Sequence, residues 1–156
     1  MTRWLPVIFV LAGCAPGLGG SATENLTDSV RLYNDGVRWQ RWENAASYLP
    51  PKERSKWVDD EDALGKDLRI TEYDVVRIDP KGEKTAMVQV KMSWYRLTEA
   101  TVHETHAMQT WERRGKDWLM VDQTRERGDE MPGLPEPLMK DDGSGGSGAA
   151  TTSAEK

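Results

Sequence analysis

The sequence contains one cysteine and one phenylalanine among its 156 residues. A single cysteine, Cys14, excludes an intramolecular disulfide and any metal site that needs several thiolates. Basic residues are also in deficit, because 21 Lys and Arg face 26 Asp and Glu, for a net charge of −5. This balance argues against nucleic acid as a partner, since nucleic-acid-binding proteins present a basic face. Seven Trp residues supply most of the aromatic surface from which a small core can be built.

The N-terminal residues have the pattern of an export signal. Arg3 is followed by an apolar stretch at 7–12, which is shorter than the roughly 20 residues that span a bilayer. Its length is typical of the apolar region of a signal peptide, and the small residues Ala12 and Gly13 then suit a cleavage site.

Leu11-Ala12-Gly13-Cys14 resembles the lipobox of bacterial lipoproteins at all four positions. The resemblance implies that the Cys14 thiol carries a diacylglycerol and that signal peptidase cuts between Gly13 and Cys14. Two or more acyl chains anchor a protein stably where one does not, so the membrane would be a partner through Cys14. Ala15 replaces the Asp that retains such proteins at the inner membrane, which implies the outer membrane, on its periplasmic side or at the cell surface. The alternative is an ordinary secretory signal, cut after Gly20 or Ala22, that discards Cys14.

Composition divides the chain into four segments. Residues 1–13 form the predicted signal peptide, and 14–26, rich in Gly, Ala and Ser, form a flexible tether. An α+β domain is predicted over 27–131. Residues 132–156 are rich in Pro, Gly, Ser, Ala and charge, and are predicted to be a disordered tail.

Hydrophobic periodicity changes from helical to alternating near residue 66. The predicted helices cover 27–40, with Thr27 as the N-cap, then 43–48, and a third helix that Pro51 opens and Gly65 ends. The predicted strands cover 68–78, 86–95, 101–111 and 118–124, with the cleanest alternation in 86–95. Helices followed by strands predict an α+β fold in which N-terminal helices pack on a curved antiparallel sheet of about four strands.

The last predicted hairpin has a turn signal at Arg114-Gly115, which we expect to place Trp111 opposite Trp118. This hairpin, the order of the elements and the segment 42–49 (WENAASYL) resemble the nuclear-transport-factor-two-like fold, a helical cone closed by a curved sheet. A cystatin-like sheet around fewer helices fits the same order. Because such a fold hosts enzymes, binding domains and assembly domains, the resemblance does not by itself imply an activity.

The only two histidines lie together in His103-Glu104-Thr105-His106. On a strand, side chains three residues apart face opposite sides of the sheet. Structural zinc takes four protein ligands and catalytic zinc takes three plus a water molecule. We therefore predict that these histidines hold no shared metal, and we assign no metal-binding or cofactor-binding residue.

A catalytic pair is the alternative for this surface. Parity places His103 on one face with Gln109 and Trp111, and Asp122 joins that face if Trp111 pairs with Trp118. A histidine and an aspartate on a Trp-lined surface could abstract a proton. The favoured interpretation is that these side chains lie at the edge of the sheet and are exposed to solvent, so no catalytic residue is assigned. The acidic run 59–62 lacks the alternating ligands and central Gly of a calcium loop and is interpreted as a solvated helix face.

Two functions follow from these patterns. The first is a lipid-anchored envelope protein that acts as a non-catalytic binding or assembly module, with an unidentified envelope protein as its partner. The alternative is a small-molecule binder or a small acid/base enzyme that uses the interior of the cone. An open pocket containing His103 or Asp122 would favour the alternative, and a filled interior would favour the first.

Overall fold

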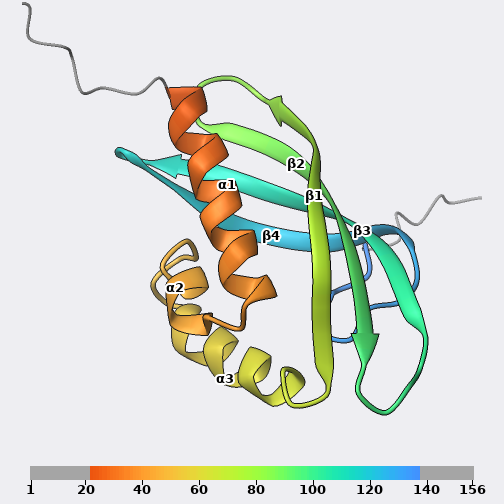
Figure 1. Cartoon of the computed structure of the whole chain (residues 1–156). Helices are drawn as coiled ribbons and strands as arrows, with labels where there is room; N and C mark the ends of the chain where they lie inside the picture. The colour runs from red at the N-terminus through yellow and green to blue at the C-terminus, as the bar shows by residue number, and fades with distance from the viewer. Residues whose placement is uncertain (1–21, 138–156) are drawn as a thin grey trace, which may run out of the picture.

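The computed structural model describes residues 22–137, with side chains from Asn25 onward. Three helices precede a four-stranded sheet (Figure 1). The elements are α1 Ala22–Arg38, α2 Trp42–Ala46, α3 Arg54–Leu64, β1 Leu68–Pro80, β2 Thr85–Arg96, β3 Val102–Arg114 and β4 Asp117–Gly128. The strands pair antiparallel in the order β1-β2-β3-β4, so the predicted α+β class and the packing of helices on a curved antiparallel sheet are confirmed.

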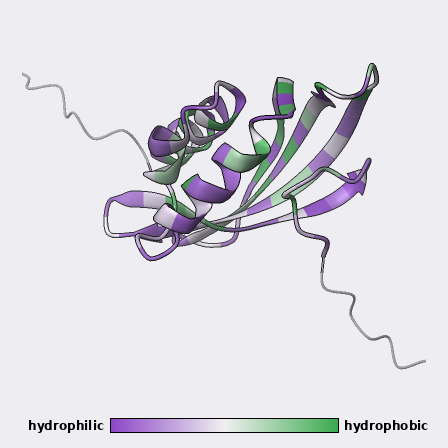
Figure 2. Ribbon diagram, turned by 90° about the horizontal axis from the view of Figure 1, so that it is seen from below, coloured by the Kyte–Doolittle hydropathy of each residue, from purple (hydrophilic) through white to green (hydrophobic). Residues whose placement is uncertain are grey.

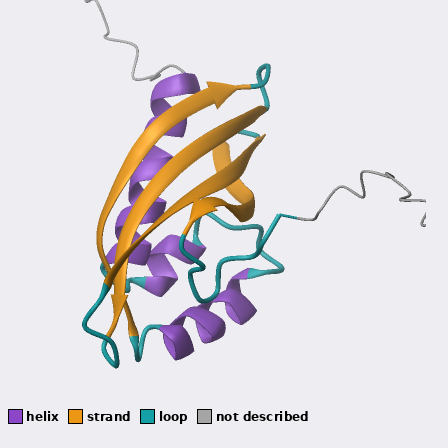
Figure 3. Ribbon diagram, turned by 90° about the vertical axis from the view of Figure 1, so that its right-hand side faces the viewer, coloured by secondary structure: helices purple, strands orange, loops and turns teal. Residues whose placement is uncertain are grey.

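Helix α1 packs along one face of the sheet (Figure 3), because its apolar residues recur at helical spacing. Leu26, Val30 and Tyr33 are all at most 3% exposed and belong to the main core. The helix ends in a hydrogen-bonded cap in which Arg41 N donates to Gly36 O and Gln40 N donates to Val37 O. Gln40 takes the left-handed conformation (φ +55°) that this cap requires.

The second strand confirms the period-two pattern expected for residues 86–95. Alternate residues of β2 point into the core, so the strand is apolar on one face. These core residues are Ala86, Val88, Val90, Met92 and Trp94. Figure 2 shows hydrophobic and hydrophilic residues following one another along the strands. The sheet and the helices therefore share one core.

The turn of the last hairpin lies one residue later than the sequence predicts. Arg114 pairs with Asp117, so the two-residue turn is Gly115-Lys116, and Gly115 has the positive φ (+67°) that this turn requires. In the resulting register Trp111 lies opposite Met120, and Trp118 lies opposite Arg113. The expected Trp111–Trp118 pair is therefore wrong, although both rings are buried on the same face.

The structure also corrects both predicted boundaries of the domain. Helix α1 begins at Ala22, and Leu26 is 1% exposed in the core, so the domain starts within the predicted tether and Thr27 lies inside the helix rather than at its cap. At the other end, Met131 and Leu134 pack against the core, and Arg125 N donates to Pro135 O. Residues 132–137 therefore belong to the domain.

The remaining predictions for the two ends fall on residues 1–21 and 138–156, which lie outside the described residues. They include the signal peptide, the cleavage site and Cys14. None of the helices described between residues 22 and 137 has the length and apolar character needed to cross a membrane.

Candidate functional site

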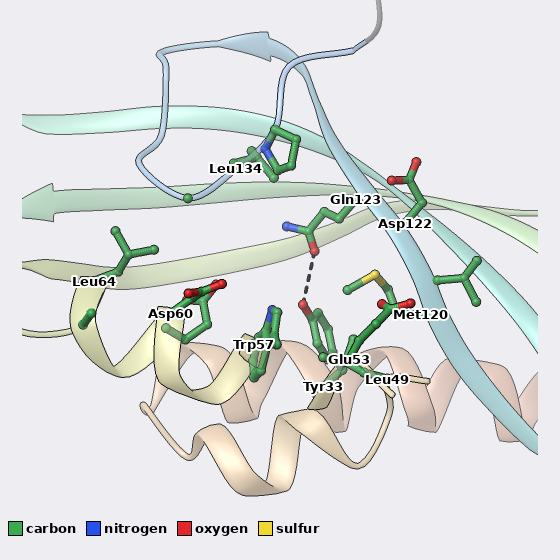
Figure 4. A pocket seen from close by; sticks show the side chains of 15 residues that line it. Tyr33, Leu49, Glu53, Trp57, Asp60, Leu64, Met120, Asp122, Gln123 and Leu134 are labelled. Atoms are coloured by element: carbon green, nitrogen blue, oxygen red, sulfur yellow. Dashed lines mark hydrogen bonds between the residues drawn. The ribbon is translucent and has the colours of Figure 1, made fainter. Parts of the chain in front are cut away.

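A cleft of about 580 Å³ opens between α3, β4 and the segment that follows β4 (Figure 4). Its apolar and aromatic wall comes from α1, α3, β4 and the residues on either side of them. The main contributors to this wall are Tyr33, Leu49, Trp57, Leu64, Met120 and Leu134. Its acidic lining consists of Glu53, Asp60, Glu61 and Asp122. We call this space the cone cleft.

Helix α3 supplies the floor of the cone cleft because one of its faces is turned inward. Trp57, Glu61 and Leu64 follow each other at intervals of four and three residues, which places them on one side of a helix. The Trp57 ring lies 6.0 Å from the Tyr33 ring and 6.2 Å from the Trp42 ring, measured between centroids. Tyr33 and Trp57 form the aromatic floor of the cleft, and Trp42 packs against Trp57 outside the cleft lining.

A buried hydrogen-bond network lies beneath this floor and joins α1 to the sheet. The Gln109 amide donates to Asn34 Oδ1 at 3.0 Å and to Gln123 Oε1 at 3.1 Å, while Trp111 Nε1 donates to Gln109 Oε1 at 3.1 Å. The Tyr33 hydroxyl also donates to Gln123 Oε1, at 3.4 Å, and Figure 4 shows this contact between β4 and α1. Buried polar groups that satisfy one another in this way fix the helix on the sheet.

Glu61 is the one strongly perturbed acid of the cone cleft. Burial, and to a smaller extent the neighbouring charge of Asp60, together raise the pKa of its carboxyl to about 7. No donor or cation among residues 22–137 pairs with this carboxylate. Glu61 also borders a small internal space next to Val37, Trp42 and Met131. Its pKa therefore lies near neutral pH, at a position between the aromatic floor and the acidic lining of the cleft.

The other acids of the cone cleft differ from Glu61 in their surroundings. Asp60 forms an ion pair with Lys56, one turn earlier on α3. Glu53 and Asp122 are exposed, and neither forms an ion pair with a described residue. None of the residues that line the cleft is Lys, Arg or His, so its field is negative.

Asp122 does not lie where parity placed it. Trp111 pairs with Met120 and Thr110 pairs with Asp122, so Val121 is an extra residue in β4. This bulge reverses the facing of the residues that follow. Gln123, not Asp122, shares the inner face with Gln109, while Asp122 is exposed at the rim of the cleft.

His103 lies on the inner face as predicted, but outside the cone cleft. Its ring stacks on Trp94 with centroids 4.4 Å apart, and its Nδ1 lies 3.0 Å from Asp129 Oδ2. Seven residues of β3 separate His103 from Thr110, the partner of Asp122, which is roughly 23 Å at 3.3 Å per residue. The proposed pairing of His103 with Asp122 is therefore wrong.

His106 confirms the strand assignment of the histidine segment. It pairs with Lys91 while His103 pairs with Trp94, so the two imidazoles point to opposite faces of β3. His106 Nε2 lies 3.4 Å from Glu104 Oε1. Over residues 22–137 the structure has no group of three or more His, Cys, Asp or Glu placed to hold a metal ion. That the two histidines bind no metal stays a prediction.

Glu61 is the functional candidate that the sequence analysis missed. It stands within the acidic run 59–62, of which Asp59, Asp60 and Asp62 are exposed as the solvated-face interpretation requires. The available signal was its spacing from Trp57 and Leu64, which places it on the apolar side of α3.

Comparison with known proteins places the fold but not the activity. No family model matches the sequence, and no curated protein matches it. Solved structures do resemble it. One is a ketosteroid isomerase-like protein from Erwinia carotovora atroseptica, with a TM-score of 0.56 and 5% identity over 69% of this chain and 98% of that one.

Two further structures resemble the chain to a similar degree. A protein of unknown function with a cystatin-like fold from Nostoc punctiforme has a TM-score of 0.54 and 9% identity over 72% of this chain and 93% of that one. A putative scytalone dehydratase from Novosphingobium aromaticivorans has a TM-score of 0.54 and 12% identity over 76% of this chain and 93% of that one. At such identities the likeness shows the fold alone. The chain has the cystatin-like, nuclear-transport-factor-two-like α+β fold.

Proposed function

We propose that this protein is a small-molecule-binding module held at the cell envelope by a lipid on Cys14. The observation that carries the binding function is the cone cleft, whose volume of about 580 Å³ falls in the usual range for small-molecule sites. Its aromatic and aliphatic wall with a few polar groups is also typical of such sites. The open cleft favours a small ligand over a purely structural assembly role.

The lipid anchor is supported by sequence. Leu11-Ala12-Gly13-Cys14 has the lipobox pattern, and the first described helix begins at Ala22. An extended chain from Cys14 to Ala22 spans at most about 28 Å, at 3.3–3.6 Å per residue. A lipid on Cys14 would therefore keep the cone cleft within a few tens of ångströms of the membrane surface.

The anchor is tested by cell fractionation. Cys14→Ala should move the protein out of the membrane pellet, because the lipobox cysteine is the proposed site of the acyl chains. Ala15→Ser is the matched control and should stay in the pellet. A Cys14→Ala protein that remains in the pellet at the level of the unchanged protein after a high-salt wash contradicts the lipid anchor.

Small-molecule binding is tested by identifying what co-purifies with the protein. The full-length protein is extracted from its own envelope, and the bound small molecules are identified by mass spectrometry. Ala63→Trp places a large ring in the lining of the cone cleft, whereas Asp62→Trp changes the neighbouring exposed residue, which does not line it. We expect a molecule that is retained by Asp62→Trp and lost with Ala63→Trp. Equal retention by both variants, or no molecule above background, contradicts the proposal.

A second candidate function is acid/base catalysis with Glu61 in place of the His103–Asp122 pair. It is favoured by one observation, the pKa of about 7 that burial gives this cleft-lining carboxyl. A group with such a pKa both accepts and donates protons efficiently at neutral pH. Once the ligand is identified, turnover of that ligand by the unchanged protein and its loss in Glu61→Gln would establish catalysis. Recovery of the ligand unaltered would leave the binding function alone.

A further inference from the structure

The charges that line the cone cleft indicate what kind of molecule fits it. Its four carboxylates come from three places in the chain: Glu53 ahead of α3, Asp60 and Glu61 on α3, and Asp122 on β4. No basic side chain lines the cleft to oppose them. Like charges that share a partly enclosed space repel one another, and they do so more strongly than in bulk water.

Several carboxylates on and beside the strands have a basic partner. Asp67 pairs with Arg96 at 2.6 Å, Asp79 with Lys81 at 2.6 Å, and Asp74 with Lys91 at 3.2 Å. In the cone cleft only Asp60 has such a partner, Lys56, whose side chain is 82% exposed. An exposed pair of this kind contributes little. The cleft therefore lacks the counter-charge that the strands provide elsewhere.

The arginine next to Glu53 in the sequence is engaged elsewhere. Arg54 follows Glu53 in sequence, but its guanidinium donates to Leu49 O and Ser47 O, both at 3.0 Å. Its two backbone contacts hold it on the segment between α2 and α3. Arg54 is not among the residues that line the cone cleft, so it does not supply the missing positive charge.

Glu61 and the aromatic floor complete the site. Trp57 lies one turn before Glu61 on the same face of α3, and its ring adjoins those of Tyr33 and Trp42. Figure 4 shows Trp57 and Tyr33 on one side of the cleft and Leu134 across from them. A carboxylate beside an aromatic floor is the combination that recognises an organic cation, because ring faces attract cations and the acid neutralises them.

We infer that the ligand of the cone cleft is an organic cation, with an ammonium group held by Glu61 and an apolar or aromatic body packed on Trp57. This inference rests on the proposed binding function and specifies its ligand class. Anionic ligands meet four carboxylates and no basic group in the cleft. A neutral ligand leaves the inward carboxylate of Glu61 without a partner, which is costly for a buried charge.

The test is a calorimetric titration of the full mature protein in nanodiscs, with empty nanodiscs as the blank. The probes are benzyltrimethylammonium, benzyl alcohol and benzoate, which carry similar rings and different charges. At pH 8, where Glu61 is mostly ionised, we expect the ammonium to bind at least about tenfold more tightly than the other two, the size of one charge-assisted contact. Glu61→Gln should lose about the same factor, whereas Glu72→Gln, an exposed acid on β1, should lose none.

A second readout separates charge recognition from simple loss of structure. Near pH 7 about half of the Glu61 carboxyls are protonated, so binding of the ammonium should release protons, and the measured heat should depend on the buffer. The titratable groups that interact with Glu61 are Asp60 on α3 and Tyr33 on α1, and the cleft is also lined by the exposed acids Glu53 and Asp122. Since Glu61→Gln keeps all of these, loss of the buffer dependence in that variant assigns the proton to Glu61.

The outcomes distinguish this inference from the function on which it rests. Equal or tighter binding of benzyl alcohol or benzoate overturns the cation class but leaves small-molecule binding in place. Absence of binding by all three probes at millimolar concentration also overturns the cation class, and the co-purified molecule then decides the binding function separately. An undiminished affinity in Glu61→Gln overturns the role of Glu61.

Discussion

The region around His103 and the cone cleft differ in how far protein partners engage their polar groups. At the His103 end, Trp94 Nε1 donates to Thr105 Oγ1 at 2.8 Å, and Thr105 Oγ1 donates to Asp129 O at 2.6 Å. His103 stacks on Trp94 and its Nδ1 lies 3.0 Å from Asp129 Oδ2, whereas its buried Nε2, 3.5 Å from Glu99, has no hydrogen-bond partner within residues 22–137. At the cone cleft, by contrast, Glu61 faces open space without a partner among the described residues.

This difference separates a structural site from a functional one. Polar groups that hydrogen-bond one another stabilise the fold, and they offer a ligand no free donor or acceptor. An inward carboxyl that no protein group stabilises costs stability, and a protein keeps such a cost where binding or catalysis needs it. His103, conspicuous in the sequence, therefore lies mainly among protein partners, and Glu61, within an acidic run, lies in the cleft for which we propose a ligand.

The largest expected effect comes from removing the aromatic anchor of the His103 end. Trp94→Ala should lower the free energy of unfolding by about 3–5 kcal/mol, because the side chain is 3% exposed and loses both the Thr105 hydrogen bond and the His103 stack. Trp57→Ala should lower the free energy of unfolding by less, because the Trp57 side chain in the cone cleft is only half-buried. Trp39→Ala, at a site 59% exposed, is the control. Urea denaturation measures all three, and a greater loss for Trp57→Ala than for Trp94→Ala would reverse the comparison.

The next effect concerns the pH dependence of stability. The folded pKa of Glu61, about 7, lies above its ordinary value of 4.5, so the folded state binds more protons than the unfolded state between these pH values. The free energy of unfolding should therefore decrease as pH rises from about 4.5 through about 7. In Glu61→Gln this decrease should be smaller by about 1–3 kcal/mol. Thermal melts from pH 5 to pH 8 check the sign. Glu72→Gln should leave the slope unchanged, and the same slope in Glu61→Gln contradicts the interior placement.

A smaller effect is expected from the segment that closes the far side of the cone cleft. A chain ending at Glu130 should be less stable than one ending at Pro137 by about 1–2 kcal/mol, because it loses the half-buried Leu134 and the Arg125–Glu136 ion pair. Denaturation of the two truncated chains measures the difference. Equal stability would show that residues 131–137 contribute nothing to the domain.

The smallest effect is expected at Asp122, the acid that sequence parity placed inside. Asp122→Asn should change the free energy of unfolding by less than about 0.5 kcal/mol, because the residue is exposed at the rim. Gln123→Leu, its neighbour, should cost about 1–3 kcal/mol, since it removes the acceptor of the Tyr33 hydroxyl and one of the two acceptors of the Gln109 amide. A larger loss at Asp122 than at Gln123 would place the bulge elsewhere.

Sequence reasoning recovers the features of the fold that local pattern determines. The alternation over 86–95 is enough to predict β2, and the change from helical to alternating period is enough to predict the α+β class. The start of α1 was missed because residues 22–26 follow a Gly-rich stretch, and only the contacts of Leu26 with the core show that they belong to the helix. Local composition does not report such tertiary contacts.

The candidate site was only partly predictable, for two physical reasons. The extra residue Val121 reverses the facing of Asp122 and Gln123, and parity counting assumes a strand without bulges. Whether Glu61 points inward depends on which side of α3 faces the sheet, which the sequence does not show. Local composition alone predicts that every residue of the acidic run 59–62 faces solvent. Its spacing from Trp57 and Leu64 was the one local sign of the actual arrangement.

The most direct test of the central claim is an NMR titration of the Glu61 carboxyl carbon, with Glu61→Gln used to assign the signal. The account predicts a pKa of about 7 in the free protein, because burial and Asp60 disfavour the charge. Saturating benzyltrimethylammonium should move that pKa downward, because a bound cation stabilises the carboxylate. A pKa in the ordinary range for glutamate, or a value that the ammonium leaves unchanged, would contradict an unpartnered carboxyl that awaits a cationic ligand.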